Sequence, residues 1–462
     1  MNSRKLGEKP IGHLLFTMSI PAIFSMFVQA LYNIVDSYFV SKLGSDELNA
    51  VSLSFPLQMI IMAVAIGIGI GVNSLIARRK GEHQDKEADE AAKTSIFMAI
   101  VMGIIFVVLG LTSARPFLGL ITENEKIIDL GTSYLSIVMT FSIWVMLEIV
   151  LTKILQAVGN MIIPMLCQLV GAITNIILDP IFIFDFGLGL GIKGAALATV
   201  VAQFIAFLLA LSMFIFKKQE IDISFKNFKI RKKYIFGILA VGLPVTLINS
   251  IGSITTTIMN TLLNNNYPTL EEGEAAVNVL GVYFKLQSFV FMPIFGLNQG
   301  AMPILGYNYG ANNKPRFIKT LRYMIITTLI IMTIGLIIFQ TIPHLLLSIF
   351  HPTELMKEIG HRAFRIISLC FIPCSFGIAF AAVFQSIGHG FKSLLMTSFR
   401  QIIMIIPSAF ILTSFAGINN IWFSYGIAET VTSLIFVPIG LLTINKQFRL
   451  RASQLDALKQ LA

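Results

Sequence analysis

The fold is decided by residues 49–81, NAVSLSFPLQMIIMAVAIGIGIGVNSLIARRKG, which recur as residues 278–310, NVLGVYFKLQSFVFMPIFGLNQGAMPILGYNYG, at an offset of 229 positions (278 − 49). The matching positions are Asn49, Phe55, Leu57, Gln58, Gly67, Gly71 and Gly81, which correspond to Asn278, Phe284, Leu286, Gln287, Gly296, Gly300 and Gly310. The same offset also relates Gln156 and Gly159 to Gln385 and Gly388. We infer that the chain is duplicated, an organisation typical of transporters in which a site between two halves opens alternately to each side.

The composition is that of an all-α membrane protein. The chain of 462 residues is 55% hydrophobic and 13% charged, with a mean hydropathy of +0.81, whereas a soluble domain carries about 25% charged residues. Twelve apolar stretches are each long enough to cross a bilayer. They are roughly residues 12–40, 50–77, 94–121, 128–156, 161–185, 192–216, 236–264, 275–305, 318–349, 359–387, 392–415 and 419–444. We therefore expect twelve transmembrane helices and no separate soluble domain.

The net charge of +10 is concentrated in alternate loops rather than on a surface suited to nucleic acid. Basic residues precede the first span and follow the second, sixth, eighth and twelfth, whereas the other loops are acidic or mixed. The positive-inside rule then places both termini in the cytoplasm of a multi-pass plasma-membrane protein. The expected partners are the lipid bilayer and small molecules, with no nucleic acid.

The repeat divides the chain into an N-lobe of six helices (residues 1–216), a basic cytoplasmic linker (217–235) and a C-lobe of six helices (236–462). An even number of spans gives both lobes the same orientation. Their pseudo-twofold axis must therefore run along the membrane normal. We expect the linker to lie on the membrane surface and to tether the lobes loosely.

A few polar residues inside the first, fifth and sixth spans are candidates for a cation site, because ionisable groups at bilayer depth are costly. They are Asp36, Asn175, Asp179 and Thr199. Carboxylate, amide and hydroxyl oxygens suit Na⁺, or a shared proton if the carboxylates lie close together. The alternatives are that Asp179 caps a helix break at Pro180, that Asp36 lies in the headgroup region, and that Asn175 and Thr199 only join helices.

The second half does not repeat these acids, since Met259 and Ile406 stand opposite Asp36 and Asp179. Its deep carboxylate is Glu429. Lys285 is expected to face the interior, either in an ion pair or at the substrate. We expect the cleft for substrate to include Gln58, Asn260, Lys285, Gln287 and Glu429. The cysteines, Cys167, Cys370 and Cys374, lie inside apolar spans, so no disulfide and no metal cluster is expected.

Five segments together resemble the MATE (multidrug and toxic compound extrusion) family of cation-coupled antiporters over essentially the whole chain. They are SIPAIFSMFVQALYNIVDSYFVSKLG (19–44), GIGIGVNSLIARRKGE (67–82), LQAVGNMIIPM (155–165), NIILDPIFIFDFGLGLGIKGAALATV (175–200) and FGLNQGAMPILGYNYGANN (295–313). The resemblance implies two six-helix lobes around a V-shaped cleft and export of cationic or amphiphilic compounds in exchange for Na⁺ or H⁺.

The resemblance also implies a site. In one branch of the family, the cation ligands match Asp36, Asn175, Asp179 and Thr199, and Pro21 is the point at which the first helix changes its packing. Another branch uses carboxylates of the seventh and tenth helices, but the tenth span here, SLCFIPCSFGIAFAAVFQ (368–385), contains no acid.

The sequence thus predicts a monomeric secondary active multidrug exporter that is not an enzyme and needs no cofactor beyond Na⁺ or H⁺ as coupling ion. The chain contains no GxxxxGK[ST] motif, so ATP is not the expected energy source. One alternative is a flippase for a lipid-linked saccharide with the same architecture, which a large basic cavity would favour. The other is a membrane enzyme or channel.

Overall fold

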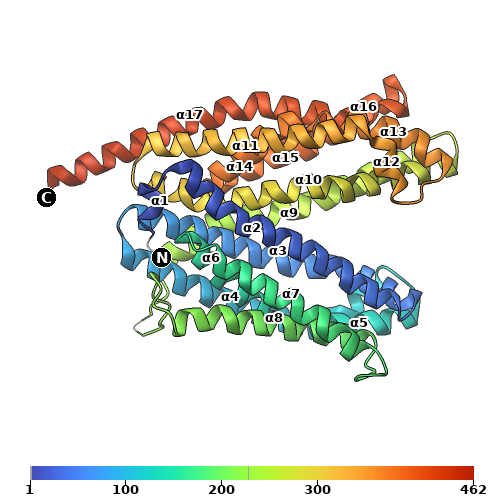
Figure 1. The fold of residues 1–462 in the computed structure, drawn as a ribbon, viewed down its shortest axis with the longest axis horizontal. Helices are drawn as coiled ribbons and strands as arrows, with labels where there is room; N and C mark the ends of the chain where they lie inside the picture. Colours follow the sequence, from blue (N-terminus) through green and yellow to red (C-terminus); the bar gives the residue numbers. More distant parts are fainter. Residues whose placement is uncertain (1–2, 227, 462) are drawn as a thin grey trace.

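The computed structural model describes residues 3–226 and 228–461. Residues 1–2, 227 and 462, which fall in the predicted N-lobe, linker and C-lobe, lie outside the described residues. Helices joined by short loops make up the described part of the chain, which contains no strand (Figure 1). The all-helical fold class is confirmed.

The described part of the first half contains eight helices. They are α1 (Lys5–Glu8), α2 (Ile11–Ser41), α3 (Ser45–Gly81), α4 (Asp85–Gly119), α5 (Glu125–Thr140), α6 (Ile143–Ala157), α7 (Ile162–Ile183) and α8 (Ile192–Ile215). The helices α5 and α6 form one span that bends by 44° between Thr140 and Ile143. Together with α2, α3, α4, α7 and α8 this gives six spans in the described part of this half.

The second half repeats this plan. Its elements are α9 (Lys232–Asn266), α10 (Leu270–Gly310), α11 (Lys314–Thr341), α12 (Pro343–Ser348), α13 (Glu354–Ser368), α14 (Phe371–Ser386), α15 (Gly390–Ser398), the π-helix η1 (Phe399–Ile405), α16 (Ile406–Ala416), the short η2 (Ile418–Asn420) and α17 (Phe423–Leu461). The helices α13 and α14 bend by 50°, so the fourth span is broken in both halves. The expected count of twelve spans is met when each bent pair is counted once.

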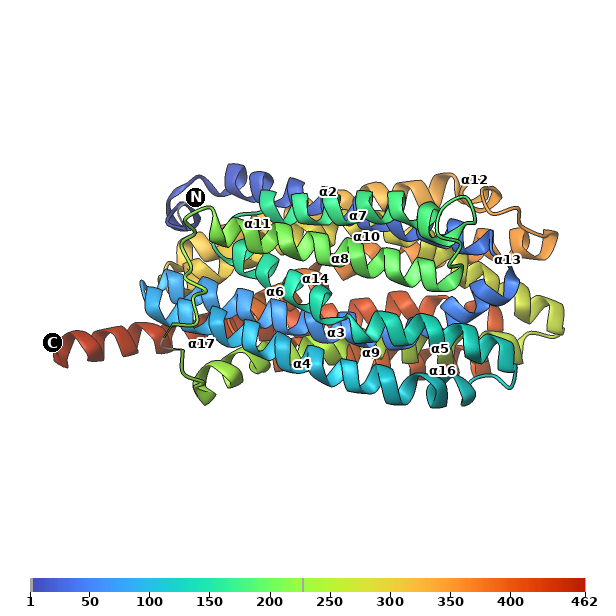
Figure 2. The ribbon, with the colours of Figure 1, turned by 90° about the horizontal axis from the view of Figure 1, so that it is seen from below.

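Both chain termini lie at one end of the bundle, here called the terminus end, and α17 projects beyond the other helices there (Figures 1 and 2). The opposite end is called the far end. The helices of the two halves form separate groups that diverge toward the far end (Figure 1).

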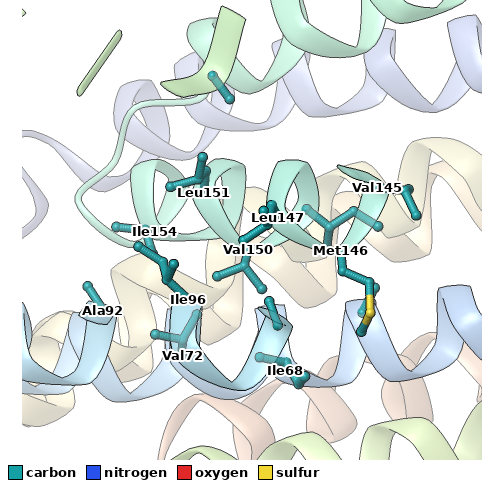
Figure 3. Packing of buried hydrophobic residues seen from close by; sticks show 14 of the residues in the cluster. Ile68, Val72, Ala92, Ile96, Val145, Met146, Leu147, Val150, Leu151 and Ile154 are labelled. Carbon is teal, nitrogen blue, oxygen red and sulfur yellow. The ribbon is translucent and has the colours of Figure 1, made fainter. Parts of the chain in front are cut away.

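The interior of the first half is a packed apolar core. Ile68 and Val72 of α3 meet Ile96 of α4 and Val150 and Ile154 of α6, all nearly inaccessible to solvent (Figure 3). Such burial stabilises by about 25 cal/mol per Å² of apolar surface removed from water. In a bilayer, close packing of small and branched residues takes over part of that role between helices. A second core joins α10, α11, α13, α14 and α17 in the other half.

The glycines of the repeated stretch form the seam between the halves. An added Cβ on Gly67 of α3 would lie 2.7 Å from the carbonyl oxygen of Gly242 on α9, and one on Gly296 of α10 would lie 2.6 Å from the backbone nitrogen of Ile23 on α2. Gly300 meets Ser19 of α2 in the same way. Only glycine permits helix backbones to approach this closely. The duplicated sequence therefore builds a duplicated contact.

The linker is held more firmly than its basic, amphipathic sequence predicts. The ammonium group of Lys80, at the end of α3, donates to the carbonyl of Glu220 at 2.9 Å, and Lys93 of α4 lies 3.2 Å from the carboxylate of Asp222. Both linker residues are acidic members of a mostly basic segment. They attach the start of the linker to the first half, and Lys233 attaches its end there through an ion pair with Glu87 of α4. The linker is therefore held at both ends rather than loosely.

Candidate functional site

The four predicted cation ligands come together in the first half. Asn175 and Asp179 stand one turn apart on α7, and Thr199 faces them from α8; all three are almost fully buried. The amide of Asn175 donates to Asp179 at 3.2 Å and lies 3.4 Å from the hydroxyl oxygen of Thr199. Asp36, partly buried on α2, brings its carboxyl group within hydrogen-bonding range of that of Asp179.

Several oxygens in this cluster lack a donor. Oδ1 of Asp36, Oδ1 of Asn175 and Oδ2 of Asp179 are buried and have no hydrogen-bond partner among the described residues. A buried acceptor without a partner is unfavourable, and two adjacent carboxylates repel each other. A cation or proton placed among these oxygens would relieve both penalties. These hard oxygen ligands suit Na⁺ or a shared proton.

The structural alternative for Asp179 does not match its position. The helix α7 continues past Pro180 to Ile183, so Asp179 does not cap a break there. Asp36 lies more than a turn before the end of α2 at Ser41 and contacts Asp179 instead of projecting away. Tyr32, whose hydroxyl bonds Thr199, belongs to the same cluster and was missed by the sequence reasoning. Its position four residues before Asp36, on the same helix face, was the available signal.

A central cavity of about 360 Å³ lies between the two halves. Its walls are mostly apolar and come from α2, α3, α6 and α7 on one side and from α9, α10, α14, α15, η1 and α17 on the other. The apolar lining includes Met26, Met62, Ile66, Phe295 and Ile378. A cavity of this size and character is suited to an amphiphilic small molecule.

The cavity and the cation cluster share two helix faces. On α2, Ser25 and Gln29 line the cavity, and Tyr32 and Asp36 follow on the same face at helical spacing. On α7, Gln168 lines the cavity seven residues before Asn175. Seven residues correspond to roughly 10 Å of helix. The cluster is therefore displaced from the cavity toward the far end and connected to it by rigid elements.

Three charged side chains line the cavity: Glu148 and Lys153 of α6 and Arg400 of η1. The ammonium group of Lys153 donates at 2.9 Å to Gln156 and at 2.9 Å to Gln299 of α10, across the boundary between the halves. Arg400 donates to Glu429 of α17 at 2.9 Å.

The predicted cleft residues lie elsewhere than expected. Lys285 is exposed, with its ammonium group 5.8 Å from the centre of the Phe350 ring and no carboxylate opposite it in the described part of the chain. Asn260 lines a separate, more open pocket between α9 and α10 at the far end, and Gln58 bonds Tyr134 of α5. Gln287 is half-buried and Glu429 sits behind Arg400; neither lines the cavity.

Depth along the helices explains these corrections. The cavity begins on α10 at Phe295, ten residues after Lys285, which is about 15 Å of helix. The repeat identified matched polar residues but gave no information about the depth at which the halves enclose a space. Arg400 was missed altogether, although a single arginine inside the predicted span 392–415 was a sufficient signal.

Comparisons with known proteins agree with this architecture. A family model described as MatE matches residues 21–181 and 235–411. A protein named multidrug export protein MepA from Staphylococcus haemolyticus is 27% identical over 445 residues, covering 95% of this chain and 96% of the relative. A MepA from Staphylococcus aureus is 25% identical over 428 residues, covering 92% and 93%.

Solved structures are also similar. An outward-facing multidrug resistance MATE transporter of the MOP superfamily superposes with a TM-score of 0.90 at 27% identity, covering 97% of this chain and 99% of that one. A MATE structure in what is called the bent conformation gives a TM-score of 0.91 at 27% identity, covering 98% and 99%. The twelve-helix, two-lobed fold predicted from the sequence is thereby confirmed.

Proposed function

Because this chain belongs to the MatE family, we propose that it is a secondary active multidrug exporter that exchanges Na⁺ or H⁺ for cationic or amphiphilic compounds. Relatives named multidrug export proteins over nearly its whole length support export as the activity. It is a multi-pass membrane protein, and we place it in the plasma membrane as a monomer with both termini in the cytoplasm, in keeping with the distribution of basic loops.

The observation that carries the coupling mechanism is the set of buried oxygens without donors at Asp36, Asn175 and Asp179. A cation or proton arriving from the far end would draw the Asp36 and Asp179 carboxylates together and so fix α2 against α7. Thr199 and Tyr32 would complete the shell of oxygens. In this proposal Na⁺ or H⁺ is a transported ion and not a resident cofactor.

Cation binding and substrate binding compete through α2 and α7. The same faces carry Gln29 and Gln168 in the cavity and Asp36 and Asn175 in the cluster. A ligand that shifts either helix therefore changes the geometry at both sites. Two sites coupled in this way influence each other's affinity reciprocally. The lobes then alternate by rocking about the seam between them.

Reconstitution tests the proposal. Purified protein in vesicles loaded with a fluorescent organic cation is given a Na⁺ gradient or a pH gradient separately. We expect one of them to drive export, and Asp36→Asn to reduce driven export at least about tenfold while the protein stays folded, because an amide cannot exchange a charge. Asp185→Asn, at an exposed loop aspartate, is the matched control. Near-normal driven export by Asp36→Asn would disprove the assignment.

A further inference from the structure

The guanidinium group of Arg400 is presented to the central cavity by a regular helical face. Met396, Thr397 and Arg400 lie three, four and seven residues after Ser393, and all four line the cavity. The π-helix η1 begins at Phe399, immediately before Arg400, and no later residue of this span lines the cavity in the described part of the chain. π-Helical turns are frequent at functional sites.

The hydrogen-bonding capacity of this arginine is largely unused. A guanidinium group has five N–H donors. Nη1 donates to Oε1 of Glu429 at 2.9 Å, and Nε has no partner among the described residues. The Arg400 side chain keeps 24% of its surface exposed, whereas that of Glu429 keeps 10% and does not line the cavity. Of this ion pair, only the Arg400 guanidinium therefore faces the cavity.

The surroundings of Arg400 are rich in donors as well. Ser393 accepts a hydrogen bond from the amide of Gln385 at 3.1 Å, and its own hydroxyl hydrogen has no acceptor among the described residues, although the side chain is fully buried in the wall. Thr397 and Thr432 add hydroxyl groups to the same wall. Such a wall is suited to an oxyanion, which arginine binds through paired N–H groups.

The charges around the cavity balance. Glu148 and Glu429 carry two negative charges, and Lys153 and Arg400 carry two positive charges, so they sum to zero. A molecule with one positive and one negative group keeps the balance. The carboxylate of Glu148, on the opposite lobe from Arg400, is available for its cationic group.

We propose that Arg400 binds an oxyanion of the transported molecule, and that the cavity therefore takes zwitterionic amphiphiles, with a carboxylate at Arg400 and an ammonium group toward Glu148. This rests on the proposed export function and specifies its substrate class. The apolar walls formed by Met26, Met62 and Phe295 accept the body of the molecule.

A matched pair of probes tests the proposal. A rhodamine with a free carboxyl group is a zwitterion at neutral pH, and its methyl ester is a simple cation of nearly the same shape. Their affinities for the purified full-length protein in maltoside micelles are measured by fluorescence polarisation. Removing Arg400 alone would strand the buried Glu429 carboxylate, so the test variant is Arg400→Gln with Glu429→Gln, a neutral pair of similar size.

We expect the double variant to bind the acid about ten- to a hundredfold more weakly, as for loss of a charge-assisted hydrogen bond, and to bind the ester within about twofold of the unaltered protein. Glu148→Gln should weaken both probes. Arg322→Gln, at an exposed position of α11, should change neither. Equal changes for acid and ester in the double variant, or no change in either, would overturn the proposal.

The headgroup of an anionic lipid could bind Arg400 through the same oxyanion chemistry. A second set of binding measurements distinguishes lipid from the transported molecule. Phosphatidylglycerol is added to the micelles as a competitor. The proposal predicts that it displaces the acid no better than it displaces the ester, whereas selective displacement of the acid would assign the anion to lipid and overturn the zwitterionic substrate class. The binding comparison needs no ion gradient, so a failure of gradient-driven export would contradict the proposed function alone.

Discussion

At the scale of single residues, Asp36 and Asp179 matter as a pair and not as two separate acids. Their carboxyl groups lie within hydrogen-bonding range of each other, and each has an oxygen without a donor in the described part of the chain. A proton or cation that serves one of them therefore serves both.

The pair predicts strongly non-additive losses. Asp36→Asn and Asp179→Asn should each lower the rate of gradient-driven export at least about tenfold, and the double variant should be hardly slower than either, because residues of one network do not contribute independently. Initial rates in vesicles, normalised to the amount of reconstituted protein, provide the measurement. Losses that multiply would place the two acids in separate sites.

The sequence identified this cluster because the cost of charge in a membrane makes each acid conspicuous, and because Asn175 and Asp179 are one helical turn apart. It could not identify the cavity in the same way. Gln58, Asn260, Lys285 and Gln287 are polar residues in apolar spans, like Gln29 and Gln168, and only the packing of the two halves decides which of them face the enclosed space. That packing depends on contacts between residues far apart in the chain.

At the scale of elements, α2 is the connection between cavity and cation cluster, and Pro21 lies near its start. The helix is continuous from Ile11 to Ser41, with Pro21 inside it and the hydroxyl of Ser25 donating to the Pro21 carbonyl at 3.0 Å. Proline in a helix removes a backbone hydrogen bond and costs about 3 kcal/mol relative to alanine, and its ring favours a kink. The helix is therefore weakest at Pro21, and a bend there would break fewer backbone hydrogen bonds than a bend elsewhere.

Pro21→Ala should restore the missing backbone hydrogen bond and so remove the weak point of α2. We expect the variant to favour the straight α2 and to export substrate several-fold more slowly, while still binding the coupling ion. Affinity for Na⁺, or for protons, is measured in detergent by the ion's effect on the melting temperature, beside the rate in vesicles. Ile20, which precedes Pro21 and is exposed on the outside of the same helix, offers a control as Ile20→Ala. An unchanged export rate would show that α2 does not bend during transport.

Apolar length predicted all twelve spans, but it could not reveal the bends between α5 and α6 and between α13 and α14. Hydrophobic residues continue through both breaks, so the helical pattern carries no sign of the first bend. At the second, Pro373 lies in the first turn of α14, where its missing N–H is tolerated, and this was a usable signal. The attachment of the linker was hidden as well, because Glu220 and Asp222 are minor members of a basic segment.

At the scale of the whole molecule, the glycines of the sequence repeat form the contacts about which the two lobes are proposed to rock. Gly67 and Gly296 occupy matching positions in the two halves, and each lies against the backbone of a helix from the other half. The two lobes therefore meet along a pair of equivalent seams, α3 on α9 and α10 on α2, related by the pseudo-twofold axis. Movement about this axis must change both seams together.

Enlarging one glycine should therefore disturb closure of the terminus end. A Cβ on Gly296 would lie within 2.7 Å of the backbone of Ile23, a separation that requires the helices to move apart, whereas a Cβ on Gly281 of the same helix meets nothing within 4 Å among the described residues. We expect Gly296→Ala to lower export about tenfold, and Gly67→Ala to do the same by symmetry. Gly281→Ala should be neutral or slightly stabilising.

The structural part of this expectation is a change in the distance between the lobes. Spin labels at Lys86 of α4 and Arg449 of α17, both exposed at the terminus end, report that distance by pulsed electron resonance. Gly296→Ala and Gly67→Ala should both shift the distribution to longer distances, while Gly281→Ala leaves it unchanged. If the distances in all three variants equal those of the unaltered protein, the glycine seam does not set how the lobes close, and rocking about it is excluded as the route of alternating access.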